Sequence, residues 1–503
     1  MYNKLKKILL IALICVTAIG QSLSFPMTAE AADSVTVNLS AEKQMIRGFG
    51  GMNYPDWQGS DLTAAQRQTA FGNGEKDLGF TILRIHVDPD KKNWYKELDT
   101  AKAAIKNGAI VFASPWHPPV ELAQTVNGQK HVNPSKYAEY AKHLNDFVSY
   151  MKENGVELYA ISVQNEPDYA NEWTWWTAQE MLNFMKNYAG TINCRVIAPE
   201  SFQYRTNMSD PILNDPTALA NMDILGAHLY GVDNPGAYSL FKQKGAGKEL
   251  WMTEVYYPNS EASSADRWPE ALKTAEHIHK SLADAEFQTY VWWYIRRQYG
   301  PMKEDGTMSK RGAMMSHYSK FVRPLYVRVD ATKNPATNVL VSAYKGDNKA
   351  VIVAINKGTS ASNQTFNVQG GGSSQVSSWV TTGSANLAKG SAISASNGSF
   401  TASLPAQSVT TFVMELGPNA TPTPTYTPTK SATPTQKNTP TPIITVDINH
   451  DGAVNMSDVM LLASAFNSSK GDSRYVREYD LNSDGAINMV DVMRIAEKFN
   501  TRI

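Results

Sequence analysis

TILRIHV (residues 81–87), AIVFASPW (109–116) and LYAISVQ (158–164) are short apolar runs of strand length. Between such runs, segments 135–154 and 176–188 carry apolar residues at helical spacing. Further runs of the strand type begin at residues 46 (IRGFGG), 195 (RVIAPES), 224 (ILGAHLY), 249 (ELWMTEVY) and 289 (TYVWWYI). Eight strand-helix units over about 280 residues predict an α/β fold, a (β/α)8 TIM barrel. A doubly wound open sheet is the alternative that the same alternation allows.

After the predicted barrel, residues 46–324, the pattern changes. Residues 325–417 contain short alternating runs (NVLVSAY, AVIVAIN, QTFNVQG and QSVTTFVM) broken by Gly, Ser and Asn. This pattern predicts an attached all-β sandwich side domain. The early run SVTVNLS has the same character, so we expect an N-terminal strand at 33–45 to join that side domain.

The N-terminus has the features of an export signal. Lys4, Lys6 and Lys7 precede an apolar run over residues 8–19, and the small-residue triplet Ala29-Glu30-Ala31 follows. A membrane anchor is the alternative, but about 12 apolar residues are fewer than the roughly 20 that span a bilayer. We therefore expect a signal peptide at 1–32 and a secreted, extracellular protein.

Charge and cysteine content exclude some partners. The chain has 47 basic and 47 acidic residues, so no charge surplus points to nucleic acid or to an anionic membrane. Of the two cysteines, Cys15 would leave with the signal peptide, and Cys194 would then have no partner for an intrachain disulfide.

Residues 418–442 read PNATPTPTYTPTKSATPTQKNTPTP, a tract with almost no apolar content. Such a composition cannot pack a core and favours an extended backbone, so we expect a linker at 418–444. A separate folded domain is then expected at 445–503.

This last segment contains a repeat with a period of 33 residues. The copies are DINHDGAVNMSD (447–458) and DLNSDGAINMVD (480–491), with oxygen-bearing side chains at loop positions 1, 3, 5, 9 and 12. Gly452 and Gly485 lie where such a loop turns sharply. The spacing predicts two calcium loops, whereas a random Asp-rich tail would not repeat in one register.

Each loop ends in Asp, not in the Glu usual in EF-hands, and a helical run follows (VMLLASAF and VMRIAEKF). These features resemble a dockerin, a small α-helical calcium-binding module that docks onto a cohesin domain of a scaffold protein. Many dockerins carry small hydroxyl residues after the ninth position, where this chain has Met456-Ser457 and Met489-Val490. The resemblance implies as calcium ligands Asp447, Asn449, Asp451, Asn455, Asp458, Asp480, Asn482, Asp484, Asn488 and Asp491.

Two glutamates close predicted barrel strands. Glu166 follows the fourth run in VQNEP, and Glu254 ends the seventh in WMTEVY. A single such Glu is usually a helix cap or a surface charge, but strand ends share one barrel mouth, and glycosidic cleavage requires a pair of carboxyl groups. The sequence contains no HExxH, CxxC or GxSxG motif and no phosphate-cradling loop, so we expect no metal or organic cofactor in catalysis.

NEP and the second Glu resemble the clan of barrel glycosidases that includes families 5, 10 and 30. The segments GFGGMNYPDW, ISVQNEPDY, GAHLYG, WMTEVYYPNS and WWYIRRQYGPMKEDG resemble family 30, specifically its bacterial glucuronoxylan endo-hydrolases. The resemblance implies a retaining mechanism with Glu166 as acid/base, Glu254 as nucleophile and Asn165 bound to the sugar 2-hydroxyl. It also relates Arg84 to an arginine beside the nucleophile, although a structural ion pair explains Arg84 as well.

Other residues at strand ends are candidates for substrate binding. Tyr230 could hold the nucleophile, and His228 is as readily a packed histidine as a functional one. The residues Trp57, Trp116 and Trp293 could be platforms for sugar rings or parts of the core.

Arg297 follows the last strand run, where its planar guanidinium could bind a carboxylate through two parallel hydrogen bonds. The resemblance implies that Arg297, Tyr299 and Tyr256, with Ser260 as a weaker candidate, contact a 4-O-methylglucuronic acid branch. The alternative is a structural arginine paired with a barrel carboxylate, and we expect Arg296 to point elsewhere.

The two resemblances, together with the export signal, imply a secreted endo-β-1,4-xylanase that cleaves glucuronoxylan at its branches and docks to a cohesin. Activity on unbranched β-glucan or a β-glucoside is one alternative, and a non-catalytic polysaccharide-binding scaffold component is another.

Overall fold

The computed structural model describes residues 33–169, 173–416, 446–449, 453–472, 474–482, 484–499 and 501–502. The predicted signal peptide (1–32), the predicted linker (418–444) and Asp451 lie outside the described residues. The chain divides into a larger unit, residues 1–434, and a smaller C-terminal unit, residues 435–503. The described helices include none that is long and apolar enough to cross a membrane.

The larger unit contains a closed barrel of parallel strands, and neighbouring strands follow the order β2-β3-β4-β7-β8-β9-β10-β11 before β11 pairs with β2. This closure confirms the predicted TIM barrel and excludes the open sheet. The strands are β2 Gly48–Met52, β3 Ile82–His86, β4 Ile110–Ser114, β7 Ala160–Ser162, β8 Val196–Ser201, β9 Ile224–His228, β10 Glu249–Val255 and β11 Thr289–Tyr294. A hairpin of β5 (Ala123–Val126) and β6 (Gln129–Val132) follows β4.

Helices connect the strands and pack on the outer face of the barrel. α5, Tyr137–Glu153, buries Tyr140, Leu144 and Phe147, which recur at helical spacing on one face. α6, Ala178–Asn187, begins at a capping box formed by Thr177 and Glu180. The others are α2 Pro55–Gln58, α3 Ala64–Phe71, α4 Leu98–Lys106, α7 Thr206–Asn214, α8 Pro216–Asn221, α9 Ser239–Lys244, α10 Leu272–Ala283 and α11 Lys310–Ser319.

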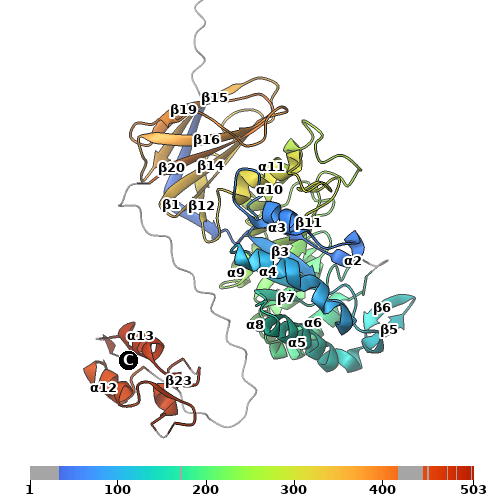
Figure 1. The fold of residues 1–503 in the computed structure, drawn as a ribbon, viewed down its shortest axis with the longest axis vertical. Coiled ribbons are helices and arrows are strands. Elements are labelled where there is room, and N and C mark those ends of the chain that lie inside the picture. Colours follow the sequence, from blue (N-terminus) through green and yellow to red (C-terminus); the bar gives the residue numbers. More distant parts are fainter. Residues whose placement is uncertain are drawn as a thin grey trace, which may run out of the picture. The chain divides into compact units, whose positions relative to one another are not determined.

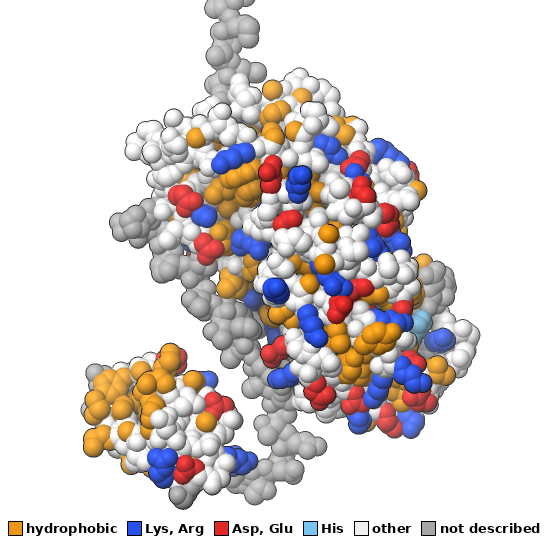
Figure 2. Space-filling view, viewed as in Figure 1, with side chains coloured by type: hydrophobic (Ala, Val, Ile, Leu, Met, Phe, Trp, Pro, Cys, Tyr) orange, Lys and Arg blue, Asp and Glu red, His pale blue; other side chains and the backbone are white. Residues whose placement is uncertain are grey.

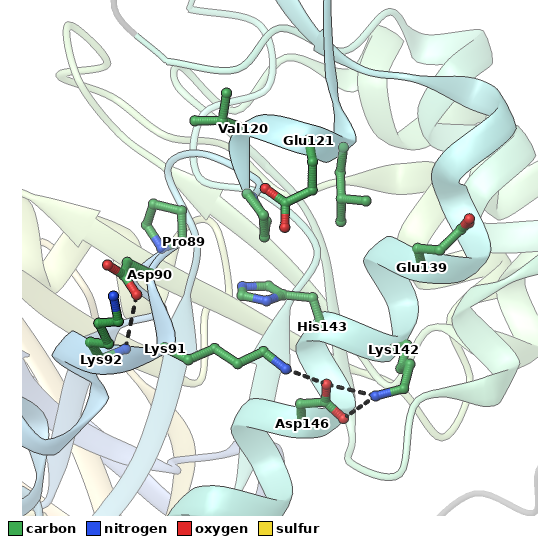
Figure 3. A pocket seen from close by; sticks show the side chains of 12 residues that line it. Pro89, Asp90, Lys91, Lys92, Val120, Glu121, Glu139, Lys142, His143 and Asp146 are labelled. Atoms are coloured by element: carbon green, nitrogen blue, oxygen red, sulfur yellow. Dashed lines mark hydrogen bonds and ion pairs between the residues drawn. The ribbon is translucent and has the colours of Figure 1, made fainter.

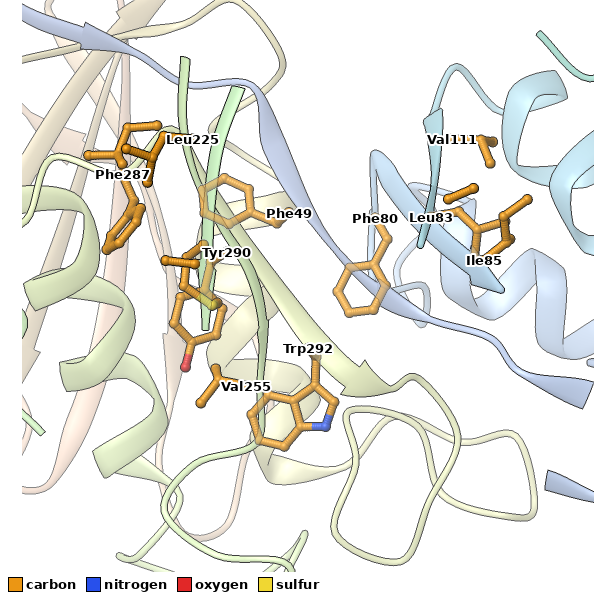
Figure 4. Close-up of a cluster of buried hydrophobic side chains, with 14 of the residues drawn as sticks. Phe49, Phe80, Leu83, Ile85, Val111, Leu225, Val255, Phe287, Tyr290 and Trp292 are labelled. Atoms are coloured by element: carbon orange, nitrogen blue, oxygen red, sulfur yellow. The ribbon is translucent and has the colours of Figure 1, made fainter. Parts of the chain in front are cut away.

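The barrel core has two layers. An inner layer fills the barrel with one side chain from each of seven strands: Ile82, Phe112, Ala160, Ile197, Ile224, Trp251 and Val291. Leu83 and Ile85 of β3 belong instead to the larger outer layer (Figure 4). Since side chains alternate along a strand, Arg84 between them points into the barrel. Gly50 is required where β2 approaches β3, because a Cβ there would lie 1.8 Å from the Ile82 carbonyl oxygen.

The side domain is one continuous sheet in the order β17-β16-β20-β14-β13-β12-β1-β15-β19, with β18 paired to β16 (Figure 1). The sheet curls around its own core, which includes Val37, Ile352, Phe366 and Phe412, so the predicted all-β side domain is confirmed. Its strands are β1 Asp33–Met45, β12 Val327–Ala331, β13 Val339–Gly346, β14 Lys349–Asn356, β15 Ser362–Gln369, β16 Gln375–Thr381, β17 Ala388–Lys389, β18 Ile393–Ser394, β19 Ser399–Leu404 and β20 Ser408–Glu415.

The barrel and the side domain share a polar contact that is fully buried. His317 of α11 lies 2.8 Å through Nδ1 from the Thr411 hydroxyl and 2.8 Å through Nε2 from the Thr381 hydroxyl. Burial lowers the pKa of His317 to about 3, so the ring is neutral at ordinary pH. Both ring nitrogens of this neutral histidine are therefore satisfied at the domain boundary.

Among the described residues of the C-terminal unit are the α-helices α12 (Met456–Ser464) and α13 (Met489–Ala496), which are capped by Asn455 and Asn488. Its short strands pair β21 (Ala453–Val454) with β24 (Thr501–Arg502) and β22 (Ser468–Ser469) with β23 (Ala486–Ile487). Val454, Leu462, Ala465, Ile487 and Ile495 form its core. Apolar side chains also gather on its surface (Figure 2), and the large exposed ones are Met456, Met460, Met489, Val490, Met493 and Phe499.

Candidate active site

Polar side chains from five barrel strands meet at the carboxyl ends of the strands. They are Arg84 on β3, Ser114 on β4, Glu200 on β8, His228 on β9 and Glu254 on β10. Glu166 lies in the loop after β7, and it is 5 % exposed. A buried polar cluster at this end of the strands is where a TIM barrel places its reacting groups.

The two candidate carboxyl groups face each other. One oxygen of Glu166, one oxygen of Glu254 and one ring nitrogen of His228 all lie within 4.8 Å of one another. A separation of about 5 Å allows one carboxylate to attack a sugar carbon while the other protonates the leaving oxygen. An inverting pair, which holds a water molecule between the carboxyl groups, is wider at about 6.5–9.5 Å.

Arg84 organises the cluster. Its Nη1 donates to Glu254 Oε2, and its Nη2 donates to Asn165 Oδ1 at 2.7 Å and to Glu200 Oε1 at 3.3 Å. The side chain is fully buried. Burial alone would lower the pKa of Arg84, but the charges of Glu200 and Glu254 raise it above its ordinary value, so the guanidinium stays charged.

His228 and Glu200 complete the cluster below the two carboxyl groups. His228 Nδ1 lies 2.9 Å from Glu166 Oε1, and Nε2 lies 3.6 Å from Glu200 Oε1. Burial disfavours the charged ring, but Glu254, Glu166 and Glu200 together raise the pKa of His228 to about 9. Ser114 Oγ donates to Glu200 Oε2 at 2.8 Å. Burial opposes ionisation of Glu200, yet Arg84 and His228 lower its pKa far below the ordinary value.

The charge balance of the cluster favours one protonated carboxyl group. Arg84 and His228 carry two positive charges, against three carboxyl groups at positions 166, 200 and 254. Burial raises the pKa of Glu254, and the charges of His228 and Arg84 oppose the rise. With Glu200 ionised, one bound proton makes the cluster neutral, which is the condition that a buried site favours.

Two further hydrogen bonds orient the candidate pair. The Tyr230 hydroxyl donates to Glu254 Oε1 at 2.6 Å, and Trp173 Nε1 donates to Glu166 Oε2 at 2.7 Å. Burial and the charge of Glu254 raise the pKa of Tyr230 far above its ordinary value, so Tyr230 remains a donor.

A cleft of about 540 Å³ opens above the pair. Trp57, Trp116, Trp173 and Trp293 line it together with both glutamates. Trp57 is 40 % exposed and stacks on Trp173, with ring centroids 5.3 Å apart. Trp116 is only 1 % exposed and covers the Arg84 guanidinium at 4.8 Å, so it is a wall of the cleft and offers no open face as a platform.

Of the predicted branch-binding residues, Tyr256 lines this cleft, and Arg297 and Tyr299 contact residues of its wall. The Arg297 guanidinium lies 4.6 Å from the centre of the Tyr294 ring, and its Nη2 donates to the Trp57 carbonyl at 3.3 Å. The Tyr256 and Tyr299 rings have centroids 5.5 Å apart. Arg296 points away toward Ser60 and Gln66, and Ser260 is exposed in the loop after β10.

Solved structures and curated relatives resemble the larger unit. A GH30 endoxylanase from Clostridium papyrosolvens C71 is 51 % identical with a TM-score of 0.72, and the match covers 76 % of this chain and 100 % of that chain. The Glucuronoxylanase XynC of Bacillus subtilis (strain 168) is 64 % identical over 422 residues, which are 82 % of this chain and 100 % of the relative. The chain belongs to glycoside hydrolase family 30.

A second structure and a domain family extend the comparison. A family 30 subfamily 8 xylanase, Xyn30A, from Clostridium acetobutylicum is 41 % identical with a TM-score of 0.69, and the match covers 76 % of this chain and 99 % of that chain. Residues 445–500 match the dockerin type I domain. The protein is therefore a glycoside hydrolase of family 30 with a C-terminal dockerin.

Sequence reasoning missed three residues of this family 30 site. Glu200 and Ser114 contact Arg84 and each other, and Trp173 contacts Glu166. Glu200 stands near the end of the run RVIAPES, just as Glu254 stands near the end of ELWMTEVY, so the same strand-end signal was available. Trp173 belongs to the aromatic run WTWW after NEP, which gives no strand signal.

The dockerin loops offer oxygen donors that suit calcium. Asp458 and Asp491 are fully buried, and their oxygens accept backbone N–H groups of their own loops, from Ile448 and Asn482 among others. Asp480 is 2 % exposed. No Lys or Arg of the described residues forms an ion pair with Asp480 or Asp491, so a calcium ion bound there would supply positive charge to these buried carboxylates. Calcium bound there would join each loop to the helix that follows it.

Proposed function

We propose that the protein is a secreted, retaining endo-β-1,4-xylanase that cleaves glucuronoxylan at positions set by (4-O-methyl)glucuronic acid branches. The observation that carries the proposal is the pair of glutamates at the barrel mouth, with one carboxylate oxygen of Glu166 within 4.8 Å of one of Glu254. The names of the related proteins, a glucuronoxylanase and two family 30 xylanases, support xylan as the substrate.

In the proposed first step, Glu254 attacks the anomeric carbon while Glu166 donates its proton to the leaving oxygen. The carbon–oxygen bond to the leaving sugar breaks, and a glycosyl ester forms on Glu254. In the second step Glu166, now a carboxylate, takes a proton from water, and the hydroxyl group replaces Glu254 at the same carbon. Two displacements at one face and then the other retain the configuration.

The neighbours of the pair support this division of roles. Arg84 and Tyr230 both donate to Glu254, which stabilises its carboxylate as the leaving group of the second step. Trp173 donates a hydrogen bond to one oxygen of Glu166, and His228 contacts the other oxygen. Only one oxygen of Glu166 therefore has a cationic neighbour. Asn165 accepts from Arg84 through Oδ1, and its amide nitrogen remains to donate to the sugar 2-hydroxyl in our proposal.

Arg297 is the residue we propose for branch recognition. Among the described residues no carboxylate forms an ion pair with Arg297, which argues against the alternative of a structural arginine paired with a barrel carboxylate. The guanidinium can therefore bind a carboxylate of the substrate in our proposal. Tyr256 and Tyr299 stand beside each other within reach of the same site, since Arg297 contacts the side chain of Tyr299. Their hydroxyl groups would donate to the same branch.

The dockerin and the N-terminus locate the enzyme in this proposal. The signal-like residues 1–32 direct export, and the dockerin binds a cohesin domain of a scaffold once calcium occupies its loops. The exposed apolar side chains at Met456, Met460, Met489 and Met493 suit a partner surface that is apolar at this contact.

The test compares wild type with Glu254→Gln on glucuronic-acid-branched and unbranched xylan. We expect wild type to release reducing sugar mainly from the branched polymer and the variant to release almost none. Mass spectrometry of the products should find one branch at a fixed position from the new end. Equal release by the variant would remove the nucleophile assignment, and products without a fixed branch position would remove the branch-directed substrate. Cleavage of β-glucan in preference to xylan would favour the other substrate class.

A further inference from the structure

A second pocket lies on the same end of the barrel as the catalytic cleft. Its volume is about 620 Å³, and it is lined by the turn after β3 (89–92), the loop after β4 (119–122) and α5 (Figure 3). Trp116, in the wall of the cleft, is three residues before Pro119 in the wall of the pocket. Three residues span at most about 11 Å, so a polymer leaving the cleft on this side can reach the pocket.

His143 gives this pocket an unusual polar group. It projects from α5 between the loop of Glu121 and the side chain of Lys91 (Figure 3), and it is 3 % exposed. Neither ring nitrogen has a hydrogen-bond partner among the described residues. Leaving a buried polar group unpaired costs free energy, and such groups in native proteins usually have a ligand or a water molecule as partner.

The ring is neutral under ordinary conditions. Burial, with Lys91 nearby, lowers the pKa of His143 to about 4. A neutral imidazole has one donor and one acceptor nitrogen. A sugar hydroxyl can serve as either partner, whereas a carboxylate or an ammonium group can satisfy only one of the two nitrogens.

The rest of the wall combines an apolar surface with charges of both signs. Pro89, Pro119 and Val120 supply apolar contact area, and Val120 is 86 % exposed at the rim. Asp146 pairs with both Lys91 and Lys142, at 2.6 and 2.8 Å, so these charges satisfy one another. A neutral ligand with hydroxyl groups and an apolar ring face fits such a wall better than an ion does.

We propose that this pocket is a second saccharide site, which binds a sugar residue of the polysaccharide that extends beyond the catalytic cleft. The inference rests on the proposed function, which supplies the polysaccharide. His143 hydrogen-bonds the sugar hydroxyls, and Pro119 and Val120 contact the ring. The site increases the affinity for long chains and leaves cleavage of short chains unchanged.

The experiment uses the full-length protein with calcium and compares two substrates: polymeric glucuronoxylan and a short branched xylo-oligosaccharide. The variants are His143→Gln, which changes the buried ring, and Val120→Glu, which changes only the exposed rim. His279→Gln is the matched control, because His279 of α10 is equally buried, has an unpartnered Nδ1 and also has its pKa lowered to about 4 by burial. Melting temperatures are measured for all variants.

We expect both pocket variants to raise KM for the polymer about fivefold or more, since each lost contact is worth about 1 kcal/mol. Their KM and kcat for the short substrate should equal those of wild type, and the control should keep the wild-type ratio of the two substrates. The proposal is overturned if the pocket variants keep that ratio, or if His279→Gln changes it equally. Wild type that cleaves neither substrate would instead refute the proposed function.

Discussion

Replacing Glu200 by Gln tests the charge arrangement beneath the catalytic pair. The substitution keeps the shape and one acceptor oxygen but removes a negative charge that Arg84 and His228 contact, at 3.3 and 3.6 Å. Glu200 touches no part of the cleft, so it is a positioning residue that acts through its two cationic neighbours.

The size of the effect follows from the geometry. At 3.6 Å between His228 and Glu200 and an effective dielectric constant of about 20, the attraction is about 5 kcal/mol, an upper limit of about three pKa units. Loss of the negative charge must lower the pKa values of His228 and Glu254 because the charge favours their protonated forms. We expect both limbs of the pH profile of kcat/KM to shift to lower pH by at least one unit, and kcat at the optimum to fall about 10- to 100-fold.

The assay is the pH dependence of initial rates on branched xylan, with thermal unfolding measured at each pH. Glu249→Gln is the matched control, because Glu249 is also buried and paired with two arginines, Arg47 and Arg195, but lies at the opposite end of β10. The control should lose stability and keep the wild-type pH profile. An unshifted profile for Glu200→Gln, or an equal shift in the control, would refute the reasoning.

Four further outcomes are expected. Arg297→Ala should fold normally and lose the preference for branched over unbranched xylan by about 10-fold or more, because a charge-assisted bond is worth about 1.5–3 kcal/mol; an unchanged ratio would contradict this. His228, with its pKa raised to about 9, stabilises the fold fully below pH about 6.5, and up to about 3 kcal/mol is lost as pH rises through 9, measurable by denaturant unfolding. His317, with its pKa lowered to about 3, has the opposite effect on the free energy of unfolding. Its contribution is complete above pH about 6.5, and below that pH it falls by up to about 1.4 kcal/mol per pH unit. His317→Gln should make the stability depend less on pH in this acid range. Chelation of calcium, or Asp491→Asn, should unfold the dockerin, as followed by circular dichroism of α12 and α13, without lowering xylanase activity on soluble substrate.

The sequence predicts the barrel well because its parallel strands are buried on both faces and read as separate apolar runs. It also predicts that Glu166 and Glu254 share one end of the barrel, since the carboxyl ends of all the strands meet there. In β3 and β9 the regular alternation holds, so Arg84 and His228 point inward with Ile82 and Ile224.

The same alternation would place Glu200 and Glu254 outside the barrel. Ile197 and Trp251 point inward, which makes positions 200 and 254 outward by period two. The pairing register shifts within β8 and β10 near these positions, and Glu200 has φ of 58°, so both side chains turn inward. Such bulges re-aim single side chains and leave little signal in residue type, so the position of Glu200 at the end of its strand run indicates a site residue, but the alternation pattern does not predict that its side chain points inward.

The tryptophans of the cleft show a second limit. Trp57, Trp116 and Trp293 all line the cleft, yet only the packing around each ring decides whether a sugar can stack on it. Trp116 is closed off by Arg84 beneath it, whereas Trp57 is open and gains its orientation from Trp173, a residue in a loop with no regular pattern. Side-chain packing of this kind depends on tertiary neighbours and cannot be predicted from the local sequence.

Strand β1 sets the order in which this chain can finish folding. It is an interior strand of the side-domain sheet, between β12 and β15, so the sheet divides into two pieces without it. Thr36 bonds to Thr332, which is 296 residues away, and the loop between them is the entire barrel. A contact that closes so long a loop forms late and slowly, after the barrel is compact. The first strand made is thus among the last to be placed, and deletion of residues 33–45 should release a folded barrel with an open, aggregation-prone sheet edge.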